Sequence, residues 1–187
     1  MDNTPESTHG TPATHGRTDT APLAHLNEMD DYKIADGEPD IRGWDVKATD
    51  GQRIGEVEDL LFDTELMKVR YIEMKVEGKF TSGDDHRWAL VPIGSSRLDE
   101  DHDNVLVSIA STELPGMPPY TRGAITRDYE TVLLQRYGRG GPEGSAANAD
   151  TDFYGTDHFD ENQTFAGRRN RASRPTKGKD SYLTRSG

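Results

Sequence analysis

The most metal-like stretch of the sequence is the acidic run DEDHD at residues 99–103. Oxygen ligands at alternate positions begin a calcium-binding loop, which also requires Gly at its sixth position and Glu at its twelfth. Asn104 and Ala110 occupy those positions. His86 and His102 lie in polar stretches without the paired spacing of a zinc site. The run therefore predicts a solvated hairpin turn, and we expect no metal site.

Paired carboxylates at Glu56, Glu58 and Asp59 are the next candidates for acid-base chemistry. In a strand with alternating faces, acidic residues are typical of the side that contacts water, and we assign these three to that side. Ser95 and Ser96 have no base that the sequence identifies. The sequence contains no cysteine, which excludes thiol catalysis and disulfides. We therefore expect no enzymatic activity, no catalytic residue and no cofactor.

Charge is unevenly distributed along the chain. The net charge is −12, and the acidic excess between residues 31 and 137 disfavours attraction of that region to a phosphate backbone. The C-terminal tail differs, because it carries Arg168, Arg169, Arg171 and Arg174. These arginines are candidates for weak polyanion contact or for folding back on the acidic domain.

The two ends of the chain have the composition of disordered segments. Residues 1–30 are rich in Thr, Pro, His and Gly, and residues 138–187 begin with a Gly-rich linker and continue with separated aromatic residues. We expect both ends to be disordered. Neither a signal peptide nor a run of about 20 apolar residues is present, which predicts a soluble, cytoplasmic protein.

Between the tails, residues 31–137 contain short strand-like segments separated by Gly and Asp turns, which are typical of an all-β barrel or sandwich. Asp50-Gly51 predicts a hairpin turn. The segment after it also fits helical spacing, but Gly55 favours a strand with a bulge. The predicted strands are Trp44–Ala48, Ile54–Phe62, Val69–Val76, Trp88–Ile93 and Val105–Ile109.

A helix is predicted over residues 126–137, after a Pro-rich connection. Tyr129, Val132, Leu133 and Tyr137 recur at helical spacing. Gly138 follows as a candidate C-cap. The apolar side of this helix is expected either to dock on the barrel or to pair with a second subunit, and it is our candidate interaction surface.

Several short motifs, in the correct order, resemble the PRC-barrel family and most closely its photosynthetic reaction centre H type. They are ADGEPDIRGW at residues 35–44, Asp50-Gly51, Ile54-Gly55, Val69-Arg70-Tyr71 and Val91-Pro92-Ile93-Gly94. The resemblance implies a closed, SH3-like barrel of about six strands without catalytic residues. The turn and core positions expected to build it are Gly43, Trp44, Gly51, Gly55, Val69, Tyr71, Trp88 and Pro92.

The resemblance implies a role as a docking surface in larger assemblies. We therefore expect a soluble, non-enzymatic adaptor that binds a protein partner or associates with itself. One alternative is an RNA- or ribosome-associated factor that uses the basic tail, although residues 1–34 offer no additional N-terminal domain. Another is a component of a photosynthetic electron-transport complex, although the membrane helix of the H subunit has no counterpart here.

Overall fold

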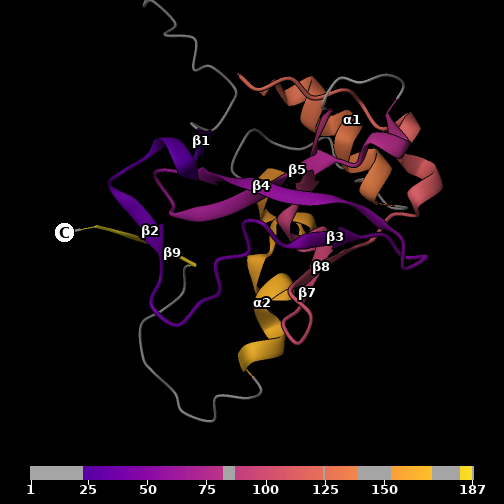
Figure 1. The fold of residues 1–187 in the computed structure, drawn as a ribbon. Coiled ribbons are helices and arrows are strands. Elements are labelled where there is room, and N and C mark those ends of the chain that lie inside the picture. Colours follow the sequence, from indigo (N-terminus) through magenta and orange to yellow (C-terminus); the bar gives the residue numbers. More distant parts are fainter. Residues whose placement is uncertain (1–22, 82–86, 124, 139–152, 170–181, 187) are drawn as a thin grey trace, which may run out of the picture.

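The computed structural model describes residues 23–81, 87–123, 125–138, 153–169 and 182–186. Most of its strands belong to one curved sheet with the order β6-β5-β4-β3-β8-β7, and β1 pairs with β4 outside this path (Figure 1). The strands of this sheet are β1 (Leu23–His25), β3 (Asp45–Lys47), β4 (Arg53–Asp63), β5 (Lys68–Val76), β6 (Trp88–Pro92), β7 (Ser96–Asp99) and β8 (Asn104–Val107).

The fold is mostly β, as predicted, but a closed barrel is not confirmed. Strands β6 and β7 end the sheet order at its two sides, and no pairing between them is present among the described residues. They are consecutive along the chain and are joined by the 3-10 turn η3 (Ile93–Ser95). The sheet thus curves around a core without completing a ring of hydrogen bonds.

The hairpin and strand predictions agree with the structure at β3, β4 and β5. Gly51 has a φ of 77°, and the Asp50 carboxylate accepts a hydrogen bond from the Gln52 amide at 3.2 Å. The segment that also fitted a helix is the 11-residue strand β4, which pairs antiparallel with both β3 and β5. The register of β4 against β5 shifts twice, between Val57 and Asp59 and between Leu61 and Phe62.

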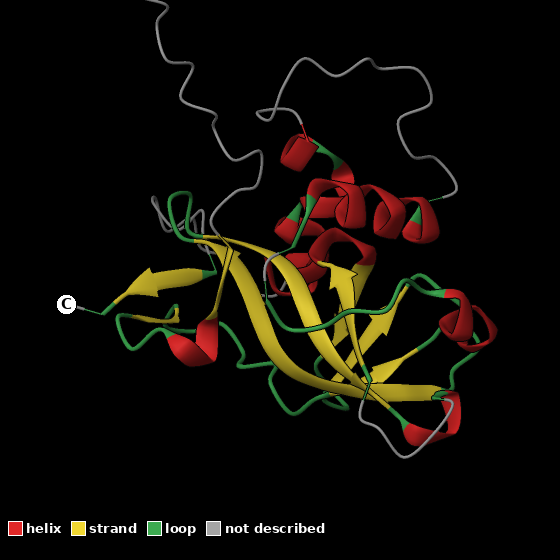
Figure 2. Ribbon diagram, turned by 90° about the horizontal axis from the view of Figure 1, so that it is seen from above, coloured by secondary structure: helices red, strands yellow, loops and turns green. Residues whose placement is uncertain are grey.

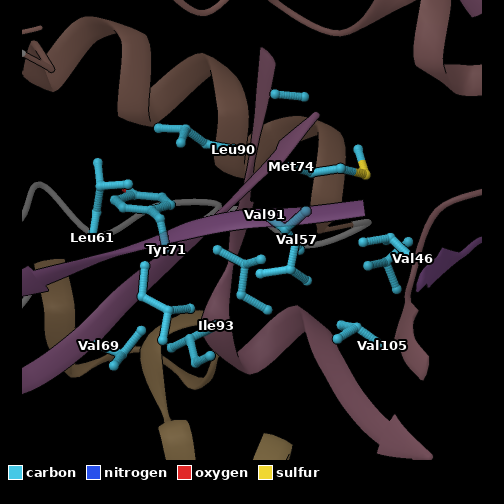
Figure 3. Close-up of a cluster of buried hydrophobic side chains, with 14 of the residues drawn as sticks. Val46, Val57, Leu61, Val69, Tyr71, Met74, Leu90, Val91, Ile93 and Val105 are labelled. Carbon is cyan, nitrogen blue, oxygen red and sulfur yellow. The ribbon is translucent and has the colours of Figure 1, made fainter. Parts of the chain in front are cut away.

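The core is filled by side chains from five strands. Figure 3 shows Val46, Val57, Tyr71, Leu90 and Val105 in one apolar cluster. Each of these residues is at most 1% exposed. Burial of each such side chain contributes about 1.5 to 3 kcal/mol, so this cluster holds the sheet in its curved shape.

Helix α1 (Arg127–Tyr137) begins after Thr126, whose side chain accepts a hydrogen bond from the Tyr129 amide. Figure 2 shows the largest group of helical segments along one side of the curved strands. The remaining helical segments are α2 (Glu161–Arg169) and the 3-10 turns η1 (Leu26–Glu28), η2 (Gly78–Phe80), η4 (Ser111–Gly116), η5 (Phe153–Gly155) and η6 (Asp157–Phe159).

Both tails contain ordered elements, which differs from the disorder that we expected there. Near the N-terminal end, β1 and η1 lie on β4. Near the C-terminal end, β9 (Leu183–Arg185) forms a second, two-stranded sheet with β2 (Tyr32–Ile34), at the left of Figure 1.

The physical reason is that aromatic residues separated along the sequence meet on the folded domain. Phe159 is 3% exposed, and its ring contacts Tyr71 edge-on with centroids 5.3 Å apart. Phe165 stacks on Tyr182 at 4.2 Å. These residues bury apolar surface against the folded domain, and local periodicity does not reveal such burial.

Candidate functional site

Two carboxylates lie side by side in the central sheet. Asp59 on β4 is the cross-strand partner of Glu73 on β5. Both residues are buried, at 1% and 0% exposure. Like charges directly opposite on neighbouring strands are destabilising, so the sheet must supply positive charge at this position.

His25 supplies part of that charge from β1, which pairs with the other edge of β4. Its Nδ1 lies 3.3 Å from Asp59 Oδ2 and 3.1 Å from Glu73 Oε2. The carboxylates of Asp59 and Glu73 raise the pKa of the His25 imidazole to about 9, against the opposing effect of burial. The two carboxylates therefore favour the protonated form of the imidazole.

The remaining carboxylate oxygens are held by other groups. Asp59 Oδ1 accepts hydrogen bonds from the Leu60 amide at 2.8 Å and from the Asn27 amide at 3.2 Å. Glu73 Oε1 accepts a hydrogen bond from Arg122 Nε at 2.6 Å. The Tyr120 hydroxyl lies 3.5 Å from His25 Nε2. Each acidic side chain thus has one oxygen held by other groups and one directed towards His25, and the Asn27 amide also lies 3.4 Å from Asp59 Oδ2.

Asp59 is buried, although the alternation of its strand predicted that it faces water together with Glu56 and Glu58. Glu56 is exposed and Glu58 is half-buried, as expected for that side. The register shift passes over Glu58, so that Val57 pairs with Met74 and Asp59 with Glu73. The bulge places Asp59 on the face of Glu73, opposite to the face of Val57 and Met74, because an extra residue reverses the alternation of faces. This face is also covered at that point, since both acids are buried.

Glu73 and His25 were not identified from the sequence. A signal for Glu73 was present, since this acid lies between the apolar residues Ile72 and Met74 in a strand that is buried on both faces. No comparable signal existed for His25, which lies in a segment that we expected to be disordered. Its role depends on the pairing of β1 with β4.

A second buried acid, Glu130 of α1, connects the helix to the sheet and to the C-terminal segment. Its Oε1 accepts hydrogen bonds from the Tyr71 hydroxyl at 2.8 Å and from the Tyr154 hydroxyl at 2.5 Å. Arg127 Nη1 lies 3.1 Å from its Oε2. Burial raises the pKa of Glu130 even though these groups oppose the shift.

The C-terminal segment 153–165 is docked by further specific contacts. Glu161 Oε1 pairs with Lys68 Nζ at 2.7 Å, and its Oε2 accepts a hydrogen bond from the Val69 amide at 3.2 Å. Gly94 lies against this segment, since a Cβ at this position would be 2.0 Å from the Asp157 carbonyl oxygen. Only glycine permits this approach.

The predicted turn and core residues occupy positions close to those expected. Gly43 has a φ of 83°, as a tight turn requires. A Cβ on Gly55 would lie 2.4 Å from the Lys75 carbonyl oxygen, so this glycine allows β4 to approach β5. Val69, Tyr71 and Pro92 are buried, and Pro92 ends β6 as predicted. Trp44 and Trp88 are half-buried and pack against the core.

The candidate interaction helix presents a different face from the one predicted. Leu133 and Tyr137 are buried on the domain, Tyr129 is half-buried, and Val132 is 45% exposed. Leu134 is 5% exposed and takes part in docking in place of Val132. The apolar side of the helix is therefore already occupied by its own domain.

The other predicted sites have simple structural counterparts. Residues 99–103 join β7 to β8 and include Asp103 with a φ of 51°, which agrees with the predicted hairpin turn. Arg168 and Arg169 belong to the end of α2, whereas Arg171, Arg174 and His86 lie outside the described residues. Ser95 does have a neighbouring base, because its hydroxyl lies 3.3 Å from His158 Nδ1.

In the described part of the chain, no helix is long and apolar enough to cross a membrane.

The family model for the PRC-barrel domain matches residues 38–114, which include β3 to β8 and the Asp59–Glu73 pair. The curved sheet, the match and the motifs between Glu38 and Gly94 agree, so residues 38–114 of the chain are similar to the PRC-barrel domain.

Proposed function

We propose that this chain is a non-enzymatic, cytoplasmic PRC-barrel adaptor that binds a protein partner or a second copy of itself. The observation that carries the proposal is the docking of residues 153–165 on a face built by β5, η3 and α1. This face recognises a peptide segment through apolar, hydrogen-bonding and charged contacts together. A segment with the same chemistry from another chain would make the same contacts.

The chemistry of the interior supports a binding role. The largest fully buried side chains include Tyr71, Phe62, Leu60 and Met74, which fill the space that a substrate would need. The Ser95 hydroxyl and His158 are one element of a nucleophilic site, but such a site also needs a group that orients the base. Among the described residues, no carboxylate contact to His158 is recorded.

The proposal is tested with the full chain at several concentrations. Light scattering after size-exclusion chromatography measures the molar mass of the wild type, of Gly94→Ala, which displaces the docked segment, and of Gly78→Ala. Gly78 is the matched control, because a Cβ there would have no atom within 4 Å. Self-association that changes in Gly94→Ala and not in Gly78→Ala supports a second copy as the partner.

If all three proteins are monomeric, the proposal requires an external partner. Proteins captured from the native host would then be purified and titrated against the full chain, with a synthetic peptide of residues 150–169 as competitor. Saturable binding that the peptide reduces supports the adaptor role. Absence of any saturable protein ligand, together with turnover or saturable binding of a small metabolite, would contradict it.

A further inference from the structure

The pair Asp59 and Glu73 and the imidazole of His25 form a site that the adaptor role does not use. Each residue offers one ligand atom, and the three atoms lie within 4.8 Å of one another. They come from β1, β4 and β5, which pair with one another in the order β1-β4-β5. The backbone of the sheet therefore fixes the positions from which the three side chains converge.

The geometry at the centre of this site is poor for hydrogen bonding. His25 Nδ1 and Glu73 Oε2 are buried, and neither makes a hydrogen bond of acceptable geometry in the described structure, although they are only 3.1 Å apart. A proton on His25 Nδ1 therefore leaves Glu73 Oε2 without a hydrogen bond, although the Glu73 side chain is 0% exposed. A buried oxygen in this state is expected to have another partner.

The two separations measured from His25 Nδ1 suit a metal ion. Two ligand atoms that each lie about 2.1 Å from one metal are about 3.0 Å apart in octahedral geometry and about 3.4 Å apart in tetrahedral geometry. The two separations from His25 Nδ1, 3.1 Å and 3.3 Å, lie in this interval. One imidazole nitrogen with two carboxylate oxygens is a donor set for zinc and its first-row neighbours.

The surrounding groups hold the ligands as outer-shell partners do in metal sites. The Leu60 and Asn27 amides fix Asp59 Oδ1, and Arg122 fixes Glu73 Oε1. The oxygens directed towards His25 are Asp59 Oδ2 and Glu73 Oε2.

We propose that His25, Asp59 and Glu73 bind a divalent first-row transition metal such as Zn²⁺, which fastens strand β1 to the central sheet. The role is structural, because the three ligands join an N-terminal strand to the two longest strands of the fold. This inference is independent of the adaptor role.

The test uses the full chain after treatment with EDTA and removal of the chelator. Zn²⁺ is titrated by calorimetry into the wild type and into His25→Gln, Asp59→Asn and His102→Gln. His102 is the matched control, since its Nδ1 also lies 3.0 Å from a carboxylate oxygen, of Asp99, but on an exposed turn. Circular dichroism verifies that each variant is folded, and Asp59→Asn keeps the shape of the site if His25→Gln does not fold.

We expect the wild type and His102→Gln to bind Zn²⁺ with equal affinity and to gain the same increase in melting temperature. The two site variants should bind at least tenfold more weakly and lose that increase. Co²⁺ provides a second probe, because its visible absorption should appear in the wild type and disappear in His25→Gln. No binding to the wild type, or equal binding to His25→Gln, would overturn the proposal.

Discussion

At the scale of single residues, the unusual feature of this protein is the burial of acids within a sheet. Asp59, Glu73 and Glu130 are each at most 1% exposed. Asp59 and Glu73 share His25, whereas Glu130 is contacted by Arg127. Removal of one partner from a buried charged group costs more free energy than the pair contributes. The consequences are measurable at His25 and at Tyr154.

The stability of the metal-free chain should depend on pH through His25. Its folded pKa of about 9 lies above the ordinary value of 6.5. The stabilisation is therefore complete below pH 6.5 and is lost as the pH rises through 9, by at most about 3 kcal/mol. Urea unfolding at pH 6, 7.5 and 9, with EDTA present, measures this loss.

His25→Gln should reduce the pH dependence over that interval, because the group that titrates is absent. His102→Gln should leave it unchanged, since His102 is exposed on the turn between β7 and β8. A wild-type stability that stays constant between pH 6 and 9 would show that the His25 ion pairs contribute nothing.

Tyr154→Phe should destabilise the fold by about 1 to 3 kcal/mol, since it removes a hydrogen bond to the buried Glu130 carboxylate. Tyr129→Phe is the control, because the Tyr129 hydroxyl is buried without a hydrogen bond among the described residues. Its loss should change stability by less than about 0.5 kcal/mol. Chemical denaturation measures both values, and equal effects would contradict the role of Glu130.

At the scale of elements, bulges and glycines determine which segments meet. The shift at Glu58 turns Asp59 towards Glu73, and a second shift passes over Arg70 of β5. Arg70 is 5% exposed and lies 4.6 Å from the Tyr154 ring centroid. The second shift therefore places a cation next to the docked C-terminal segment.

Gly94→Ala should displace η6 from η3, because the new Cβ would meet the Asp157 carbonyl oxygen at 2.0 Å. We expect a loss of about 1 to 3 kcal/mol, as for other overpacked sites. Hydrogen exchange of the amides in residues 157–165 should become faster, while the amides of β4 and β5 stay protected. Gly78→Ala should change neither measurement, and unchanged exchange in Gly94→Ala would contradict the close contact.

At the scale of the whole molecule, the C-terminal part of the described chain is tied to residues 32–39. Strand β9 pairs with β2, the Ala35 amide donates a hydrogen bond to the Tyr182 carbonyl at 2.8 Å, and the Tyr182 hydroxyl donates to the Pro39 carbonyl. Phe165 stacks on the Tyr182 ring. The segment around Tyr182 therefore joins α2 to the N-terminal part of the domain.

Tyr182→Ala should lower the free energy of unfolding by about 3 kcal/mol, since it removes a buried aromatic ring and its stacking partner. Leu66→Ala serves as the control, because Leu66 is 62% exposed and its truncation should cost little. Thermal unfolding of the full chain measures the difference. Equal melting temperatures for the two variants would show that the C-terminal strand does not contribute to the stability of the domain.

The sequence identified the elements that follow from local chemistry. Gly51 and Asp50 marked the β3–β4 turn, Pro92 marked the end of β6, and residues 126–137 had the spacing of the α1 helix. The orientation of that helix was less accurate, since Leu134 and not Val132 is buried. Two apolar stripes overlap on this helix, one with Val132 and one with Leu134, and both contain Leu133. Helical spacing alone does not show which of the two stripes faces the domain.

The sequence by itself determined a β-rich domain similar to the PRC barrel, a net negative charge and the absence of cysteine chemistry, because turns, alternation and composition are local properties. Only the tertiary structure brought His25 to Asp59 and Glu73 and docked the aromatic residues of the C-terminal segment. These contacts join residues far apart in the chain and depend on one bulge and on pairing between strands. No pattern within a single segment encodes them.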